Sequence, residues 1–155
     1  MVVWQVTTLF LARLFAALTR AGGAVPAGPL AGVWMGLYQP PTGPPTQQTL
    51  MGSITEANYD GYSRQQVVWF PTWLSAGGPQ VLQAQDLWFS PIDALKPNLI
   101  TGIFLADAFY GGNLLMAAPL ATPGVTLYGP GAALKVQAVY QQGFGALYGG
   151  PVVQS

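Results

Sequence analysis

Apolar and polar residues alternate along several short stretches of the chain, most clearly in ALKVQAVYQ at residues 133–141. Side chains of a β-strand point to opposite faces in turn, so this alternation predicts a strand with one buried face. The buried face would carry Leu134, Val136, Ala138 and Tyr140. The outer face would carry Lys135 and Gln137, with Val139 as the one apolar exception.

Other short apolar stretches predict further strands, and clusters of glycine and proline separate them. These stretches span residues 30–38, 63–70, 81–89, 98–107, 113–120 and 124–129. The proline-rich residues 40–49 predict a surface loop, because proline donates no backbone hydrogen bond. Many short strands joined by tight turns are typical of an antiparallel β-sandwich or barrel, and we expect a β-sandwich or jelly-roll-like domain.

A different period occurs near the N-terminus, where four apolar residues follow the spacing of one helix face. They are Leu11, Leu14, Phe15 and Leu18. Thr7 or Thr8 could cap the start, and glycines and prolines in AGGAVPAGP at residues 21–29 mark the connector that follows. The sequence therefore predicts one β-rich domain over residues 1–140, with an amphipathic N-terminal α-helix at about residues 8–19.

The last segment, residues 141–155, is rich in glycine but keeps several large apolar side chains. They are Phe144, Leu147, Tyr148, Val152 and Val153. One interpretation is an interface arm that lays these side chains in pockets of an adjacent subunit. The other is a frayed terminus, which is common in proteins of all classes.

Charged residues are scarce, because only ten of the 155 residues are charged and their charges sum to zero. They make up 6% of the chain, against about 25% in ordinary soluble domains. Such a surface favours association, so we expect neighbouring chains to cover much of it. A membrane-spanning helix is not expected, because no run of about 20 uninterrupted apolar residues is present.

The chain contains no cysteine and no histidine, which removes thiolate nucleophiles, disulfides, the usual zinc ligands and the commonest general base. No glycine-rich phosphate loop with its lysine is present, and five scattered basic residues do not make a nucleic-acid surface. We therefore expect no cofactor, no metal, no nucleic acid partner and no membrane partner. The aromatic residues could stack on sugars, although packing in the core or an interface is their commoner role.

The stretch DAFYGGNLLMAAPL, residues 107–120, is the most conspicuous place for chemistry, because an acid, two glycines and an asparagine interrupt apolar sequence. Gly111 and Gly112 can take the positive backbone angles of a tight hairpin. Asp107 and Asn113 can accept hydrogen bonds from turn amides. We predict that these four residues form a structural turn.

A catalytic interpretation of this turn would require a second acid beside Asp107, as glycoside hydrolysis requires paired carboxylates. The candidates are Glu56, Asp86 and Asp93, and the sequence gives no reason for two of them to converge. A calcium site is also not expected, because the acids are scattered rather than gathered in one dense loop. The sequence therefore predicts no catalytic residue and no enzyme.

Four segments in their order and spacing resemble a family of small virion structural proteins of tailed bacteriophages. The segments are GYSRQQVVWF, DLWFSP, ITGIFLADAFYGGNLLMAAPL and VTLYGPGAALKV, and the resemblance covers about residues 9–140. Ser63 stands where the family usually has alanine, and Pro130 and Gly131 replace a glycine followed by an acid. The resemblance implies a non-enzymatic part of a virion, assembled in the host cytoplasm.

The composition favours one role within the virion, because a protein that cements capsid subunits can leave its uncharged surface against neighbours. We therefore expect a capsid decoration protein whose partners are the phage major capsid protein and copies of itself, with a trimer as the expected oligomer. The alternative is a tail or head fibre that binds host surface glycans. A fibre of this kind would present exposed aromatic side chains.

Overall fold

The computed structural model describes residues 5–6, 32–46, 48–73, 80–92, 96–137, 139–143, 146–149 and 152–154. Within these residues the chain is mainly β, its sheets are antiparallel, and the only helix is the short 3-10 turn η1 (Met51–Ser53). The N-terminal helix predicted at about residues 8–19 lies outside the described residues. No helix in the described part of the chain is long and apolar enough to cross a membrane.

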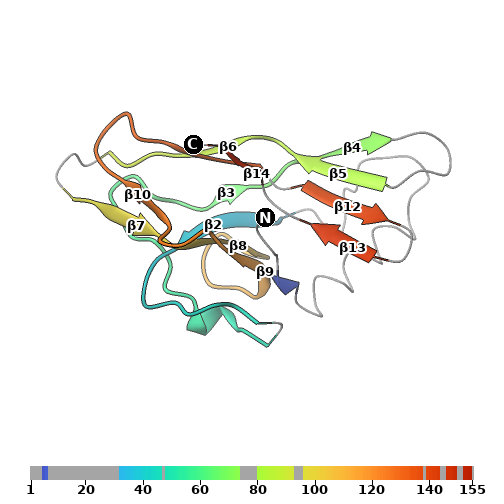
Figure 1. Cartoon of the computed structure of the whole chain (residues 1–155), viewed down its shortest axis with the longest axis horizontal. Coiled ribbons are helices and arrows are strands. Elements are labelled where there is room, and N and C mark those ends of the chain that lie inside the picture. Colours follow the sequence, from blue (N-terminus) through green and yellow to red (C-terminus); the bar gives the residue numbers. More distant parts are fainter. Residues whose placement is uncertain are drawn as a thin grey trace.

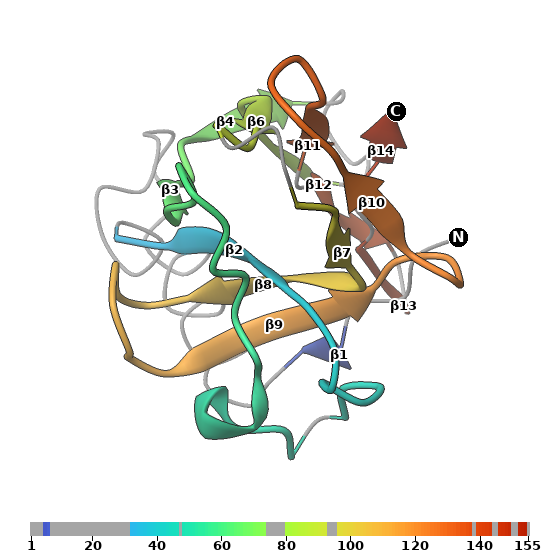
Figure 2. The same ribbon diagram turned by 90° about the vertical axis from the view of Figure 1, so that its left-hand side faces the viewer.

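The largest sheet has five strands in the order β1-β9-β8-β2-β3, and every neighbouring pair is antiparallel. The strands are β1 (Gln5–Val6), β9 (Leu114–Pro119), β8 (Gly102–Ala106), β2 (Trp34–Tyr38) and β3 (Gln65–Gln66). Figure 2 shows β2, β8 and β9 side by side as one layer, with β6 and β11 above them.

A second group of strands lies opposite this layer. The three-stranded sheet has the order β14-β11-β6, with β14 (Val152–Gln154), β11 (Leu134–Gln137) and β6 (Leu87–Phe89). The pair β10 (Val125–Leu127) and β7 (Asn98–Ile100) lies beside these strands in Figure 2.

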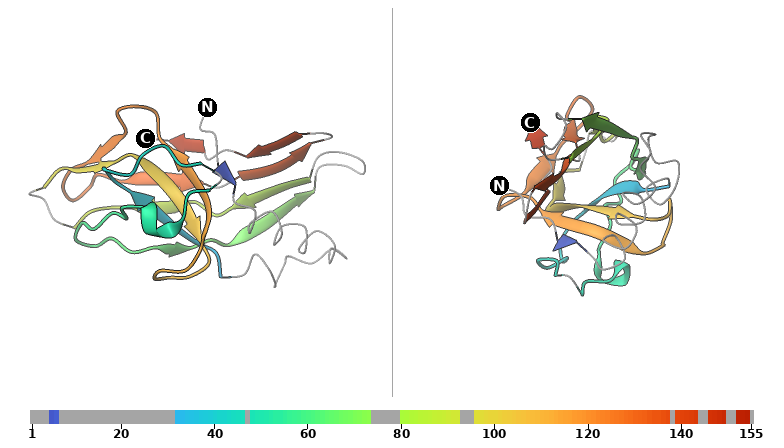
Figure 3. Two further views of the ribbon diagram at one scale, coloured as in Figure 1. Left: turned by 90° about the horizontal axis from the view of Figure 1, so that it is seen from below. Right: turned by 90° about the vertical axis from the view of Figure 1, so that its right-hand side faces the viewer.

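A four-stranded sheet in the order β13-β12-β5-β4 extends away from the body of the molecule (Figure 1 and Figure 3, left). Its strands are β13 (Ala146–Gly149), β12 (Val139–Gly143), β5 (Gln80–Ala84) and β4 (Trp69–Trp73). We call these four strands the ribbon. Strand β5 is followed along the chain by β6, and β12 is preceded by β11. Strands β5 and β12 pair with each other, as do β6 and β11, so the ribbon prolongs the three-stranded sheet.

The C-terminal residues 141–155 include two strands, β13 and β14, that pair with earlier strands of the same chain. Strand β13 pairs with β12, where Gly149 lies opposite Tyr140, and β14 pairs with β11, where Val152 lies opposite Gln137. The register is the same in both pairs. The sequence analysis did not predict these two strands in residues 141–155, because the local glycine content argues against regular structure. Contact of this segment with an adjacent subunit stays a prediction.

Three predicted strands are each divided in two where the strand changes its partner. Residues 98–107 form β7, which pairs with β10, and then β8, which pairs with β2 and β9. The break falls at Thr101, whose amide donates to the carbonyl of Tyr38 at 2.9 Å. Residues 81–89 divide into β5 and β6, and residues 63–70 divide into β3 and the start of β4, in the same way.

One hydrophobic cluster joins the two groups of strands. It contains Met35, Leu37, Ile103, Leu105 and Leu115 from the large sheet, Leu87, Phe89, Leu134 and Val136 from the facing strands, and Ile100 and Leu127 from β7 and β10. On β11, Leu134 and Val136 are buried while Lys135 and Gln137 are partly exposed, which confirms the predicted alternation for these four residues. Because this cluster contains residues of both groups, the main core lies between the large sheet and the facing strands.

The other face of the large sheet carries a smaller cluster, which includes Phe104, Ala106, Tyr38 and Ile54. All five residues of β8 are buried, because alternate side chains enter the two clusters. This burial on both faces explains why β8 is a continuous apolar run rather than an alternating one. Ile54, which follows η1, belongs to this second cluster, and the guanidinium of Arg64 lies over the ring of Phe104 on the same face.

Candidate functional site

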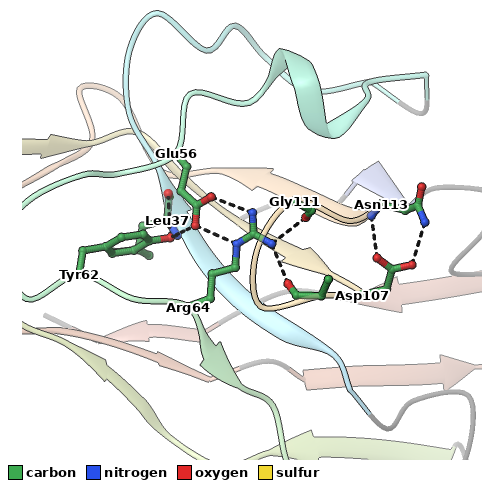
Figure 4. A network of polar contacts seen from close by, with 8 residues as sticks. Leu37, Glu56, Tyr62, Arg64, Asp107, Gly111 and Asn113 are labelled. Atoms are coloured by element: carbon green, nitrogen blue, oxygen red, sulfur yellow. Dashed lines mark hydrogen bonds and ion pairs between the residues drawn. The ribbon is translucent and has the colours of Figure 1, made fainter.

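The turn between β8 and β9 is held closed by hydrogen bonds across its base. The carboxylate of Asp107 accepts from the backbone amide of Asn113 at 2.6 Å and from its side-chain amide at 2.9 Å (Figure 4). Gly111 and Gly112 have φ values of 58° and 77°, in the left-handed region that favours glycine. The structure thus places all four residues of the predicted turn at one hairpin end.

Arg64 is the one buried charged residue in the described part of the chain, with 5% of its surface exposed. Its guanidinium donates to both carboxylate oxygens of Glu56, through Nε at 2.8 Å and Nη2 at 2.7 Å. Its Nη1 donates to the carbonyls of Ala108 and Gly111 at 2.7 and 2.8 Å (Figure 4). Arg64 therefore ties the turn at residues 107–113 to the segment that carries Glu56.

The Glu56 carboxylate also binds Tyr62, and this tyrosine links the turn to strand β2. The hydroxyl of Tyr62 donates to Glu56 Oε1 at 2.8 Å and accepts from the backbone amide of Leu37 at 3.0 Å. Burial raises the pKa of the Tyr62 hydroxyl, and the negative charge of Glu56 raises it further. We call Glu56, Tyr62 and Arg64 the clamp, because together they join β2 to the β8–β9 turn.

The packing around the clamp leaves little freedom. The Arg64 guanidinium lies over the ring of Phe104, 5.0 Å from the ring centroid. A Cβ atom added to Gly36 would lie 2.7 Å from the Tyr62 hydroxyl and would also meet the Phe104 ring. Glycine at this position of β2 therefore leaves room for the Tyr62 hydroxyl and for the Phe104 ring of the neighbouring strand β8.

Each candidate acid of the described residues has a different partner. Glu56 pairs with Arg64, Asp86 pairs with Lys135 at 2.8 Å, and Asp107 binds Asn113. Asp93 lies outside the described residues. Among the described residues no group of three or more acids, histidines or cysteines could hold a metal ion.

The sequence analysis did not predict the clamp. It considered Glu56 only as a possible catalytic acid, and it placed Arg64 in the predicted strand at residues 63–70 and in the segment GYSRQQVVWF that resembles the phage family. Spacing gave no signal for this pair, because Asp60 lies closer to Arg64 in the sequence than Glu56 does. The sequence cannot show that the arginine also reaches a turn 44 residues further along the chain.

Exposed aromatic side chains lie at three places in the described part of the chain, one of which is Tyr128 after β10. At the β8–β9 turn, Phe109 contacts Trp34 edge to face at 4.9 Å between centroids, and Tyr110 contacts Phe109 at 4.3 Å. Tyr110 is 81% exposed. On the facing strands, Trp88 of β6 is 56% exposed.

The comparisons with known proteins fit a virion component. A family described as "Podophage GP4 fiber I protein gp80" matches residues 10–140. The chain belongs to this family of phage structural proteins. No curated protein and no solved structure matches the chain.

The matched range contains the clamp, the β8–β9 turn and the strands of both core layers except β1 and β14. The predicted membership of a phage virion family is confirmed by this match. The family description names a fibre protein, so it supports the predicted alternative, a fibre, better than the predicted capsid decoration protein.

Proposed function

We propose that this chain is a non-enzymatic fibre component of a podophage virion and that it contacts the host surface. The observation that carries the proposal is the match of residues 10–140 to a family described as a podophage fibre protein. The fibre replaces the capsid decoration role as the preferred function. The low charge that first favoured decoration is equally suited to a fibre built from tightly associated subunits.

The described acids support a role without catalysis. Glu56 is engaged by a guanidinium and a phenol, and Asp107 is engaged by the turn that it closes. A general acid or base has to exchange a proton with a substrate, whereas the oxygens of both carboxylates already accept hydrogen bonds from groups of the protein itself. Both acids are thus suited to holding a loop in place.

Two structural parts of the proposal go with this function. We infer that the large sheet and the facing strands form a β-sandwich, since side chains of both enter one hydrophobic cluster. We also infer that the ribbon binds copies of the same chain. Residues 69–84 and 139–154 include none of the ten charged residues, and β4 and β13 are edge strands of their sheet.

Uncharged edge strands associate readily unless another chain covers them, and natural proteins often protect free edges with lysine. Neither edge strand of the ribbon contains lysine, and only β4 contains a proline, Pro71, so a neighbouring subunit of the fibre is the expected cover of β13. A trimer remains the expected oligomer. Sedimentation of the purified chain tests this part, because a monomer at micromolar concentration would contradict it.

Adsorption competition tests the host contact. Host cells are incubated with the purified chain before phage is added, and unadsorbed phage is counted. A fibre that binds the host should slow adsorption in proportion to the protein added, whereas bovine serum albumin at equal concentration should not. Unchanged adsorption at saturating protein would contradict the proposed contact.

A further inference from the structure

Trp88 is an exposed tryptophan between two core residues. Its neighbours Leu87 and Phe89 are 3% and 2% exposed, whereas Trp88 is 56% exposed on the opposite face of β6. The backbone at Trp88 is held on both sides, because β11 pairs with it and the side-chain amide of Gln65 donates to its carbonyl. The indole is therefore presented to solvent from a fixed strand.

Two of the ten charged residues of the chain lie beside this indole. Lys135 is the cross-strand partner of Trp88, and its ammonium lies 5.6 Å from the ring centroid. The ammonium also pairs with the carboxylate of Asp86 at 2.8 Å. The two side chains remain 27% and 40% exposed, so both can reach a ligand.

We propose that Trp88, Asp86 and Lys135 form a saccharide-binding site, an inference that rests on the proposed host contact and names its ligand class. A pyranose ring has an apolar C–H face that stacks on an aromatic ring, and its edge carries hydroxyl groups. The indole supplies the apolar surface. The Asp86 carboxylate accepts from hydroxyl groups, and the Lys135 ammonium donates to hydroxyl or ring oxygens.

The charges at the site favour a saccharide over two other ligand classes. A nucleic acid requires several unpaired cations to neutralise phosphates, and Lys135 is already paired with Asp86. The side chains of a bound apolar peptide would remove water from this ion pair without offering it hydrogen bonds, which costs free energy. Neutral hydroxyl groups can bind both charges while leaving the pair intact.

Tyr110 is the competing exposed aromatic residue, and Tyr128 gives a matched control. Tyr128 is 60% exposed and follows β10, so it resembles Trp88 in exposure and is aromatic. Variants W88A, D86N, Y110A and Y128A of the full chain would be compared with the original sequence. The probe is surface polysaccharide extracted from the bacterium on which the phage is propagated, immobilised on a biosensor.

The original chain should bind this polysaccharide, and W88A should weaken the binding at least tenfold. D86N should weaken it about threefold to tenfold, because the amide accepts more weakly than the carboxylate. Y128A should bind like the original chain. Binding by W88A within twofold of the original, or a loss confined to Y110A, would overturn the proposed site.

The indole also packs on Lys135, so circular dichroism melting accompanies each variant. If W88A has a lower melting temperature than the original chain, W88L becomes the variant that tests the site, because leucine keeps an apolar side chain on the strand without an aromatic face. Weakened binding by folded W88L supports the site, and unchanged binding refutes it. Phage carrying W88L separates this inference from the proposed function, since normal assembly into fibres with unchanged adsorption would refute only the saccharide site.

Discussion

Replacing Arg64 by alanine should destabilise the protein more than any change to an exposed charge. The substitution removes two hydrogen bonds to Glu56 and two to the carbonyls of Ala108 and Gly111. It also removes the contact of the guanidinium with the Phe104 ring. Glu56 would keep its charge and lose its cation.

The magnitude follows from how far the partners can recover water. Breaking a buried ion pair by removing one partner costs about 3–5 kcal/mol. The Glu56 side chain is 29% exposed and Gly111 is exposed, so hydration would recover part of this cost. We expect R64A to lower the free energy of unfolding by about 3 kcal/mol, which corresponds to a fall in Tm of roughly 6–12 °C for a chain of this size.

Urea denaturation followed by circular dichroism measures this change, and Lys135 supplies the matched control. The Lys135–Asp86 pair has a similar separation, 2.8 Å, but both of its side chains are partly exposed, whereas Arg64 is buried. K135A should therefore cost less than about 1 kcal/mol. If R64A costs no more than K135A, the clamp does not hold the turn in the way described.

Three further perturbations, two substitutions and a change of pH, test other parts of the structure. Gly102→Ala should cost about 2 kcal/mol in urea denaturation, because the added methyl group would overlap the Tyr38 ring; an effect under about 0.5 kcal/mol would contradict that packing. Gly112→Val should lower stability by more than about 1 kcal/mol, since its φ is positive and a Cβ would lie 2.6 Å from Asp107 Oδ1; an unchanged Tm would refute the requirement for glycine. Burial raises the pKa of Tyr38 and Tyr59 to about 12. The neutral phenols therefore stabilise the fold below pH 10, and this stability is lost as the pH rises from about 10 to 12. A free energy of unfolding that stays constant over this interval would contradict the burial of both hydroxyls.

The sequence predicted the strand content better than the strand partners. Alternation on β11 and the continuous apolar run of β8 follow from local burial, so both could be read from residue patterns. The division of residues 98–107 at Thr101 could not, because it depends on which distant strand pairs with each half. Pairing of distant strands leaves no local mark in a single sequence.

The candidate site shows the same limit. The residue types of the β8–β9 turn carry its chemistry, since aspartate, glycine and asparagine favour turns for local reasons. The clamp requires three segments to meet, and its arginine binds carbonyl groups, which every residue possesses. Arg64 therefore gives no pairwise signal toward Ala108 or Gly111.

The position of this chain in the virion tests the central claim most directly. Cryo-electron microscopy of purified particles, with separate symmetry-resolved averaging of the head and of the attached fibres, would locate its density. The proposed function predicts density for the β-rich domain within a fibre, with the ribbon of each copy against a neighbouring copy. Density spread over the head and bound to capsid subunits would contradict the fibre and restore the capsid decoration role.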